Sequence, residues 1–157
     1  MTPGLDLSLQ FGTFAGAAAH RHVLRPALVR KWMAMALLRP AEIAVRIVGS
    51  DEGQSLNREY RGKDYATNVL TFAYNEGEED LADDAPTQAD IILCTDVLEK
   101  EAAEQKKSVE EHAAHLIIHG VLHAQGYDHM DDEEATEMEG IETELLAALG
   151  YADPYAE

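Results

Sequence analysis

Residues 108–126 read SVEEHAAHLIIHGVLHAQG and predict one long helix at the centre of the protein. Ser108 and Glu111 have the spacing of an N-terminal capping box, and Gly126 is a natural C-terminal stop. One side of this helix is covered by apolar residues, namely Ala113, Ala114, Ile117 and Val121. We therefore expect the helix to pack through this side and to turn its other side toward a site.

The other side carries imidazoles within an arc of roughly 80°, from His112, His115, His119 and His123. Gly126 can take the left-handed conformation that reverses the chain and returns His129 to the same face. His119, His123 and His129 then predict a site for one metal ion with one coordination position left for water, as in catalytic rather than structural zinc sites. Any one of these histidines taken alone is more simply a core or surface residue. Three of them around a glycine, in a chain with seven histidines, favour the metal site.

Two neighbouring side chains have open roles. His115 is expected to line the site or to orient a ligand, although it could also replace His129 as the third ligand. Asp128 is either an outer acceptor for His129 or a side chain that stabilises its own turn. His112 is expected to be exposed to solvent.

The spacing of the three ligands also matches the H-E-x-x-H-x-x-G-x-x-H pattern of metzincin peptidases, in which the glutamate is the general base. This chain has Gly120 at the glutamate position. A glycine cannot accept a proton, so the sequence predicts the metal geometry of a peptidase without its base. A zinc peptidase remains an alternative that this substitution opposes.

The run from His119 to His129, HGVLHAQGYDH, resembles the signature of the YbeY family of bacterial endoribonucleases. A second block is similar as well: YRGKD at residues 60–64, followed by TNVLTF at residues 67–72, with Thr71 where serine is usual. The resemblance runs from about residue 41 to about residue 149. Ala73 stands where proline is common and Ala89 where glycine is common, which puts loop geometry in doubt and leaves the metal ligands untouched.

This resemblance implies a metal-dependent endoribonuclease that is specific for single strands, matures small-subunit ribosomal RNA and takes part in ribosome quality control. It also implies one zinc ion per chain and contacts with the small ribosomal subunit and the GTPase Era. Cleavage of a phosphodiester builds negative charge, for which Arg61 is the best candidate partner and Lys63 a plainer one. The alternative for Arg61 is an ion pair with Asp64 or another carboxylate. A noncatalytic assembly factor with structural zinc is a further alternative. For the enzyme, the attacking group is either water or the ribose 2′-hydroxyl.

The net charge of −18 opposes RNA binding by long-range repulsion. The charge is segregated, however, because residues 1–63 hold nine bases and five acids, whereas residues 64–157 hold three bases and twenty-five acids. We therefore expect the N-terminal bases to form a positive face beside the metal, on which RNA or the ribosome docks. The alternative is a solvated helix face of mixed charge.

The remaining sequence predicts a single α+β domain over residues 1–157, and the family resemblance suggests a mixed four-stranded sheet. Expected strands lie at residues 5–9, 43–47, 67–72 and 90–94, with helices near 24–38, 51–60, 95–107, 108–126 and 131–149. Cys94 is the only cysteine and is expected to be a buried, inert thiol. Without a recognisable signal segment or membrane span, the chain is expected to be cytoplasmic.

Overall fold

The computed structural model describes residues 5–12, 24–37, 40–61, 69–73, 87–125 and 132–151. Its strands are β1 (Leu5–Phe11), β2 (Ala41–Val48), β3 (Val69–Ala73) and β4 (Thr87–Cys94). Its helices are α2 (Pro26–Ala36), α3 (Ser50–Arg61), α4 (Thr95–Glu104), α5 (Val109–Ala124) and α6 (Asp132–Ala148).

Within these residues the strands form one four-stranded sheet in the order β1-β2-β4-β3. β1 is parallel to β2, and β2 is parallel to β4, whereas β3 runs antiparallel to β4 at the edge. The predicted α+β class, with a small mixed sheet and five helices, is confirmed. Each expected strand and helix is present, with bounds that differ by a few residues.

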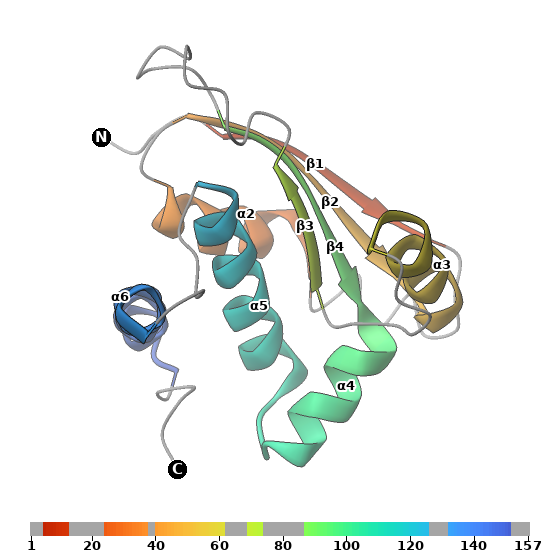
Figure 1. Ribbon diagram of the computed structural model, residues 1–157. Coiled ribbons are helices and arrows are strands. Elements are labelled where there is room, and N and C mark those ends of the chain that lie inside the picture. Colours follow the sequence, from red (N-terminus) through yellow and green to blue (C-terminus); the bar gives the residue numbers. More distant parts are fainter. Residues whose placement is uncertain are drawn as a thin grey trace.

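The helices lie in layers on the two faces of the sheet (Figure 1). On one face, α5 packs against β3 and β4, α2 packs beside α5, and α6 covers the outer side of α5. On the opposite face, α3 packs over β2 and β4. The predicted central helix is therefore central in the fold, because it has the sheet on one side and α6 on another.

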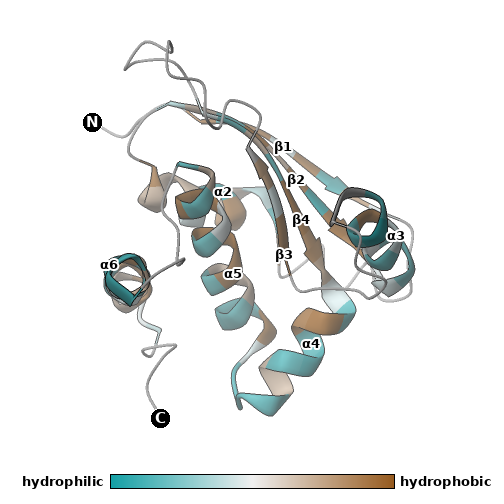
Figure 2. Cartoon of the chain, in the orientation of Figure 1, coloured by the Kyte–Doolittle hydropathy of each residue, from teal (hydrophilic) through white to brown (hydrophobic). Residues whose placement is uncertain are grey.

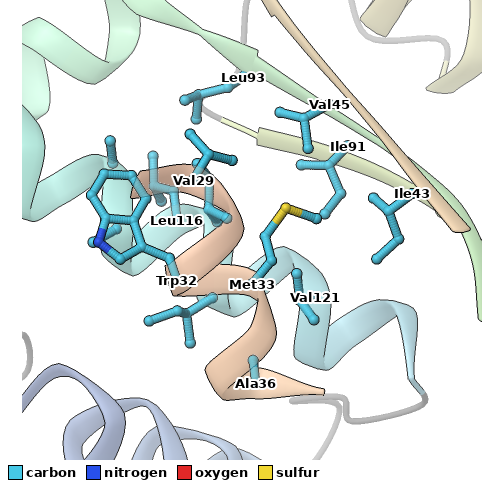
Figure 3. Close-up of a cluster of buried hydrophobic side chains, with 14 of the residues drawn as sticks. Val29, Trp32, Met33, Ala36, Ile43, Val45, Ile91, Leu93, Leu116 and Val121 are labelled. Carbon is cyan, nitrogen blue, oxygen red and sulfur yellow. The ribbon is translucent and has the colours of Figure 1, made fainter. Parts of the chain in front are cut away.

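The larger core lies between the sheet and α2, α5 and α6. Trp32 and Met33 from α2 are fully buried, and Figure 3 shows Met33 directed toward Ile91 of β4 and lying beside Val121 of α5. Full burial of each such side chain contributes about 1.5–3 kcal/mol. Hydrophobic residues occupy the strands, while the outer turns of α3 and α4 are hydrophilic (Figure 2). This core fixes α5 against the sheet.

β4 begins earlier than the sequence predicts, at Thr87 instead of Asp90. The added residues alternate, with Thr87 and Ala89 buried and Gln88 exposed. The start of the strand was not predicted because it lacks a run of large apolar residues. Its alternation of buried and exposed residues is nevertheless typical of a strand with one solvated face. In the described ranges, no helix has the length and apolar character that crossing a membrane requires.

Candidate metal centre

α5 carries the histidines and is firmly held at its start. The Ser108 side chain accepts a hydrogen bond of 3.0 Å from the Glu111 backbone N–H, as the predicted cap requires. Most of the helix is buried, and His119 and His123 lie on its partly exposed side. Their rings are one turn apart, with centroids separated by 6.5 Å and planes inclined by 7°. Two of the three predicted ligands are thus presented side by side.

A carboxylate from α6 reaches the first of these histidines. Glu142 is fully buried, and its Oε1 accepts a hydrogen bond of 2.7 Å from His119 Nδ1. A carboxylate can only accept, so the proton of this hydrogen bond belongs to Nδ1. In neutral His119 the lone pair is then on Nε2, which is the nitrogen that would bind a metal ion.

The same carboxylate oxygen is shared with a second histidine. His115 Nε2 lies 3.3 Å from Glu142 Oε1, and the His115 side chain is 13% exposed. Its ring is nearly perpendicular to that of His119, at an interplanar angle of 80°. Because Nε2 of His115 is directed at Glu142, this geometry favours the predicted site-lining role over direct metal ligation.

The expectation that His112 is exposed is wrong. His112 is 2% exposed, and its Nε2 lies 3.0 Å from Oε1 of Glu101 on α4. Burial lowers the pKa of His112, and the hydrogen bond with Glu101 opposes that shift only in part. His112 lies on the imidazole side of α5, as expected, but the predicted helix α4 covers that end of α5, and this packing was not predicted. His112 is a buried polar residue between two helices.

Gly120 faces the sheet. A Cβ added at Gly120 would lie 3.2 Å from Ile91 Cδ1 and 3.2 Å from Thr71 Oγ1. The missing side chain lets α5 approach β3 and β4 closely. A glutamate at this position would meet the sheet, so the position is unsuited to a general base for steric reasons as well as chemical ones.

The same contact brings together the two sequence blocks that carry the resemblance. Thr71 belongs to the TNVLTF segment and lies on β3, whereas Gly120 belongs to the histidine segment on α5. About fifty positions separate them along the chain. The fold therefore places part of the second block directly beside the helix of the first.

The end of α5 is anchored to α2. Gln125 Nε2 donates to the Ala36 carbonyl oxygen at 2.7 Å and to the Val121 carbonyl oxygen at 3.2 Å. Ala36 is the last residue of α2, so this hydrogen bond satisfies a carbonyl that the helix leaves without an internal partner. Gln125 thereby fixes the C-terminal end of α5. Gln125 is not among the predicted site residues.

Several predicted site residues lie outside the described residues, namely Lys63, Asp128 and His129. Arg61 is the last residue of α3, and its side chain is likewise outside the description. Among the residues that are described, no group of three histidine, cysteine, aspartate or glutamate side chains is arranged to hold a metal. The three-histidine site and the phosphate contact of Arg61 therefore stay predictions.

The described basic residues do not form one face. Arg46 makes a two-pronged ion pair with Glu52 of α3, with Nη2 and Oε1 separated by 3.1 Å. This hydrogen bonding to Glu52 raises the pKa of Arg46. Arg30, in contrast, belongs to α2 on the α5 side of the sheet and donates to the Leu5 carbonyl oxygen at 2.8 Å. The expectation that the N-terminal bases form a positive face beside the metal is therefore wrong for Arg46.

Cys94 is buried at the end of β4, as predicted. Burial raises the pKa of its thiol, which disfavours the reactive thiolate. Gly53 approaches it closely, since a Cβ there would lie 3.3 Å from Cys94 Sγ. The thiol has a packing role in the smaller core beneath α3.

Glu142 is the site residue that sequence reasoning missed most clearly. The apolar residues Met138, Ile141, Leu145 and Leu149 predict one buried face of α6, and this face does not include Glu142. Met138, Glu142 and Leu146 are the buried residues of this helix. Their i, i+4, i+8 spacing is a usable signal, because it places one carboxylate inside an apolar stripe. A charge in such a stripe calls for a partner.

Comparison with known proteins shows similarity to one protein family over nearly the whole chain. The family profile described as Endoribonuclease YbeY matches residues 16–150. A relative from Herminiimonas arsenicoxydans named Endoribonuclease YbeY is 63% identical over 154 residues, which cover 98% of this chain and 96% of the relative. Another of the same name, from Janthinobacterium sp. (strain Marseille), is 67% identical over 133 residues, covering 85% and 84% respectively.

A structural comparison agrees on the fold. The solution structure of a Thermotoga maritima protein has a TM-score of 0.51 and 23% sequence identity, and the match covers 96% of this chain and 99% of that one. At this identity the likeness speaks for the fold, whereas the profile and the curated relatives speak for the family. By its sequence over nearly its full length, this chain belongs to the endoribonuclease YbeY family.

Proposed function

We propose that this chain is a metal-dependent endoribonuclease that cuts single-stranded RNA during maturation of the small-subunit ribosomal RNA. The observation that carries the proposal is the hydrogen bond between buried Glu142 and Nδ1 of His119, which leaves Nε2 for a metal ion. Family membership supplies the class of reaction. We assign the activity to one domain made by the whole chain.

The donor set suits zinc. His119, His123 and His129 offer neutral imidazole nitrogens, which zinc binds readily, and Cys94 is buried at the end of β4 rather than on α5. One zinc per chain would lower the pKa of a water molecule and polarise a phosphoryl oxygen. The geometry of His119 and His123 on one partly exposed side of α5 is consistent with this use.

The protein's own residues supply binding and charge. Arg61 is proposed to bind the scissile phosphate with its planar guanidinium, and Lys63 to add a second positive charge. Asp128 is proposed to accept a hydrogen bond from His129. The attacking group is either water or the ribose 2′-hydroxyl. A 2′,3′-cyclic phosphate at the product end would identify the 2′-hydroxyl.

The proposed cellular location and partners follow from the proposed substrate. A nuclease for small-subunit ribosomal RNA works where ribosomes assemble, so we place the protein in the cytoplasm and propose contacts with the small subunit and the GTPase Era. Ribosome quality control is a further proposed role of the same activity. These proposals rest on the resemblance of the histidine and arginine segments to the family.

The alternatives differ in how the structure bears on them. A zinc peptidase needs a base at position 120, and the close packing of Gly120 against Ile91 and Thr71 opposes one. A noncatalytic assembly factor needs a closed metal shell, for which His115 is the candidate fourth ligand. The direction of His115 Nε2 toward Glu142 opposes that arrangement.

The test is cleavage of a single-stranded RNA and of its duplex by purified, zinc-loaded protein, beside His119→Ala and Arg61→Glu. We expect cleavage of the single strand and loss of activity by at least about 100-fold in both variants. Arg58→Glu is the matched control for the arginine, because it reverses an exposed charge one turn earlier on α3. Activity that persists in His119→Ala and Arg61→Glu would reveal a contaminating nuclease and sink the proposal.

A further inference from the structure

Glu142 differs from the other carboxylates of α6 in its burial and its contacts. α6 carries many exposed carboxylates, yet the Glu142 side chain is fully buried. A buried carboxylate is unfavourable unless hydrogen-bond donors surround it. Here Oε1 meets two ring nitrogens, His119 Nδ1 at 2.7 Å and His115 Nε2 at 3.3 Å. Both come from the helix that carries the predicted metal ligands.

The position of Glu142 is set by packing on both sides. Met138 lies one turn before it and Leu146 one turn after it, and both are buried against the main core. Beyond the C-terminal end of α6, the Tyr151 hydroxyl donates a hydrogen bond to Glu110 Oε2 at 2.8 Å. This hydrogen bond connects Tyr151 to the first turn of α5. The Glu142 carboxylate is therefore held rigidly toward α5.

This rigidity has a consequence for His119. A carboxylate fixed at Nδ1 keeps the proton on that nitrogen and holds the ring in one orientation. Nε2 is then presented in the same direction in every molecule, without a reorganisation step before binding. Carboxylates behind metal-bound histidines also raise the basicity of the ligand.

We propose that Glu142 is a positioning residue for the metal centre, which fixes the tautomer and orientation of His119, and that His115 helps to hold the Glu142 carboxylate in place. This inference rests on the proposed function, because it concerns the same three-histidine site. It makes α6 a part of the site, although α6 carries none of the predicted ligands. His115 belongs to the support of the site and not to the ligands.

The test measures metal affinity apart from catalysis. Zinc dissociation constants are obtained by competition with a chromophoric chelator on folded, metal-free protein, for wild type, Glu142→Gln and Glu142→Leu. We expect affinity to fall in that order, to a final loss of about 10–100-fold. Glutamine can still accept from Nδ1 without its charge, whereas leucine removes the acceptor.

A matched control separates this role from a general effect of losing a buried charge. Glu101→Gln changes the carboxylate that lies 3.0 Å from His112 on the same helix, seven residues before His119. It should leave zinc affinity unchanged within about threefold. Visible spectra of the Co²⁺ form add a second readout, since only the Glu142 variants should alter the ligand field.

Stability provides the third comparison. Leucine fills an apolar interface, so Glu142→Leu should melt at the same temperature as the wild type or above it while binding zinc more weakly. Unchanged zinc affinity in folded Glu142→Gln and Glu142→Leu would overturn the inference, with the proposed function left intact. A wild-type protein that binds no zinc would instead refute the metal site itself.

Discussion

At Gly120 the backbone of α5 lies against the sheet, with Ile91 and Thr71 where a side chain would begin. An alanine here gains helix propensity of about 1 kcal/mol but must displace both neighbours by a few tenths of an ångström. A glutamate must also bury a charge. The residue that distinguishes this chain from peptidases is thus fixed by packing.

We predict that Gly120→Glu loses about 3 kcal/mol or more of unfolding free energy, and Gly120→Ala much less. Urea denaturation followed by circular dichroism measures both. Neither variant should cleave unstructured protein. A stable Gly120→Glu variant with zinc-dependent peptidase activity would contradict this explanation of the glycine.

His112 gives the fold a pH dependence of known sign. Burial lowers the pKa of His112 in the folded state from 6.5, so the unfolded chain binds the proton more readily. The stability that depends on neutral His112 is fully present above pH 6.5 and is lost as pH falls toward the lowered, folded-state value.

We therefore expect the metal-free wild type to lose more stability than His112→Gln between about pH 7 and pH 5.5. Denaturation at a series of pH values gives this difference directly, and subtraction of the two curves removes the other titrating groups. Parallel curves over that range would show that His112 is not the group responsible.

Element by element, the sequence predicted the fold well because periodicity and helix caps are local. The Ser108 cap and the apolar side of α5 needed only neighbouring residues, and both are confirmed. The contacts of His112 with Glu101 and of His119 with Glu142 depend on how α4 and α6 pack against α5. The sequence of α5 does not indicate which helix covers each histidine, so the contacts with Glu101 and Glu142 were not predicted.

The C-terminal end of α6 offers a test of how that helix is held. Gly150 has a φ of +88°, and the Tyr151 N–H reaches the Leu146 carbonyl oxygen at 2.9 Å, which closes the helix and directs Tyr151 toward Glu110. Gly140 lies in the exposed middle of the same helix, and an added Cβ there has no neighbour within 4 Å.

The two glycines should therefore respond with opposite signs to the same substitution. Gly150→Ala should cost about 1–2 kcal/mol, because alanine is strained at positive φ. Gly140→Ala should stabilise by up to about 1 kcal/mol through helix propensity. Thermal melting of the pair measures both effects, and equal shifts in one direction would refute the helix ending described here.

At the scale of the whole molecule, the described basic residues of the N-terminal half lie on both faces of the sheet. Arg25, at the N-cap of α2, and Lys31, within α2, are exposed in the layer that contains α5, whereas Arg46 is paired with Glu52 of α3 on the other face. The net charge of −18 still repels RNA at long range. A local contribution from α2 would work against that repulsion near the site.

We predict that Arg25→Glu with Lys31→Glu weakens single-stranded RNA binding and makes log Kd less steep against log salt concentration. Arg46→Ala, whose charge is already paired, should change neither by more than a small amount. Fluorescence anisotropy at several salt concentrations gives both quantities. An unchanged salt slope in the double variant would exclude α2 as the docking face.

Titration of metal-free protein with zinc tests whether a zinc ion bound by His119, His123 and His129 makes this chain a nuclease. The initial rate of single-stranded RNA cleavage is followed as zinc is added, for wild type and for His119→Ala. We expect a rate that rises to a plateau at one zinc per chain and no rise in the variant. Full activity before any zinc is added, or an equal rise in His119→Ala, would contradict it.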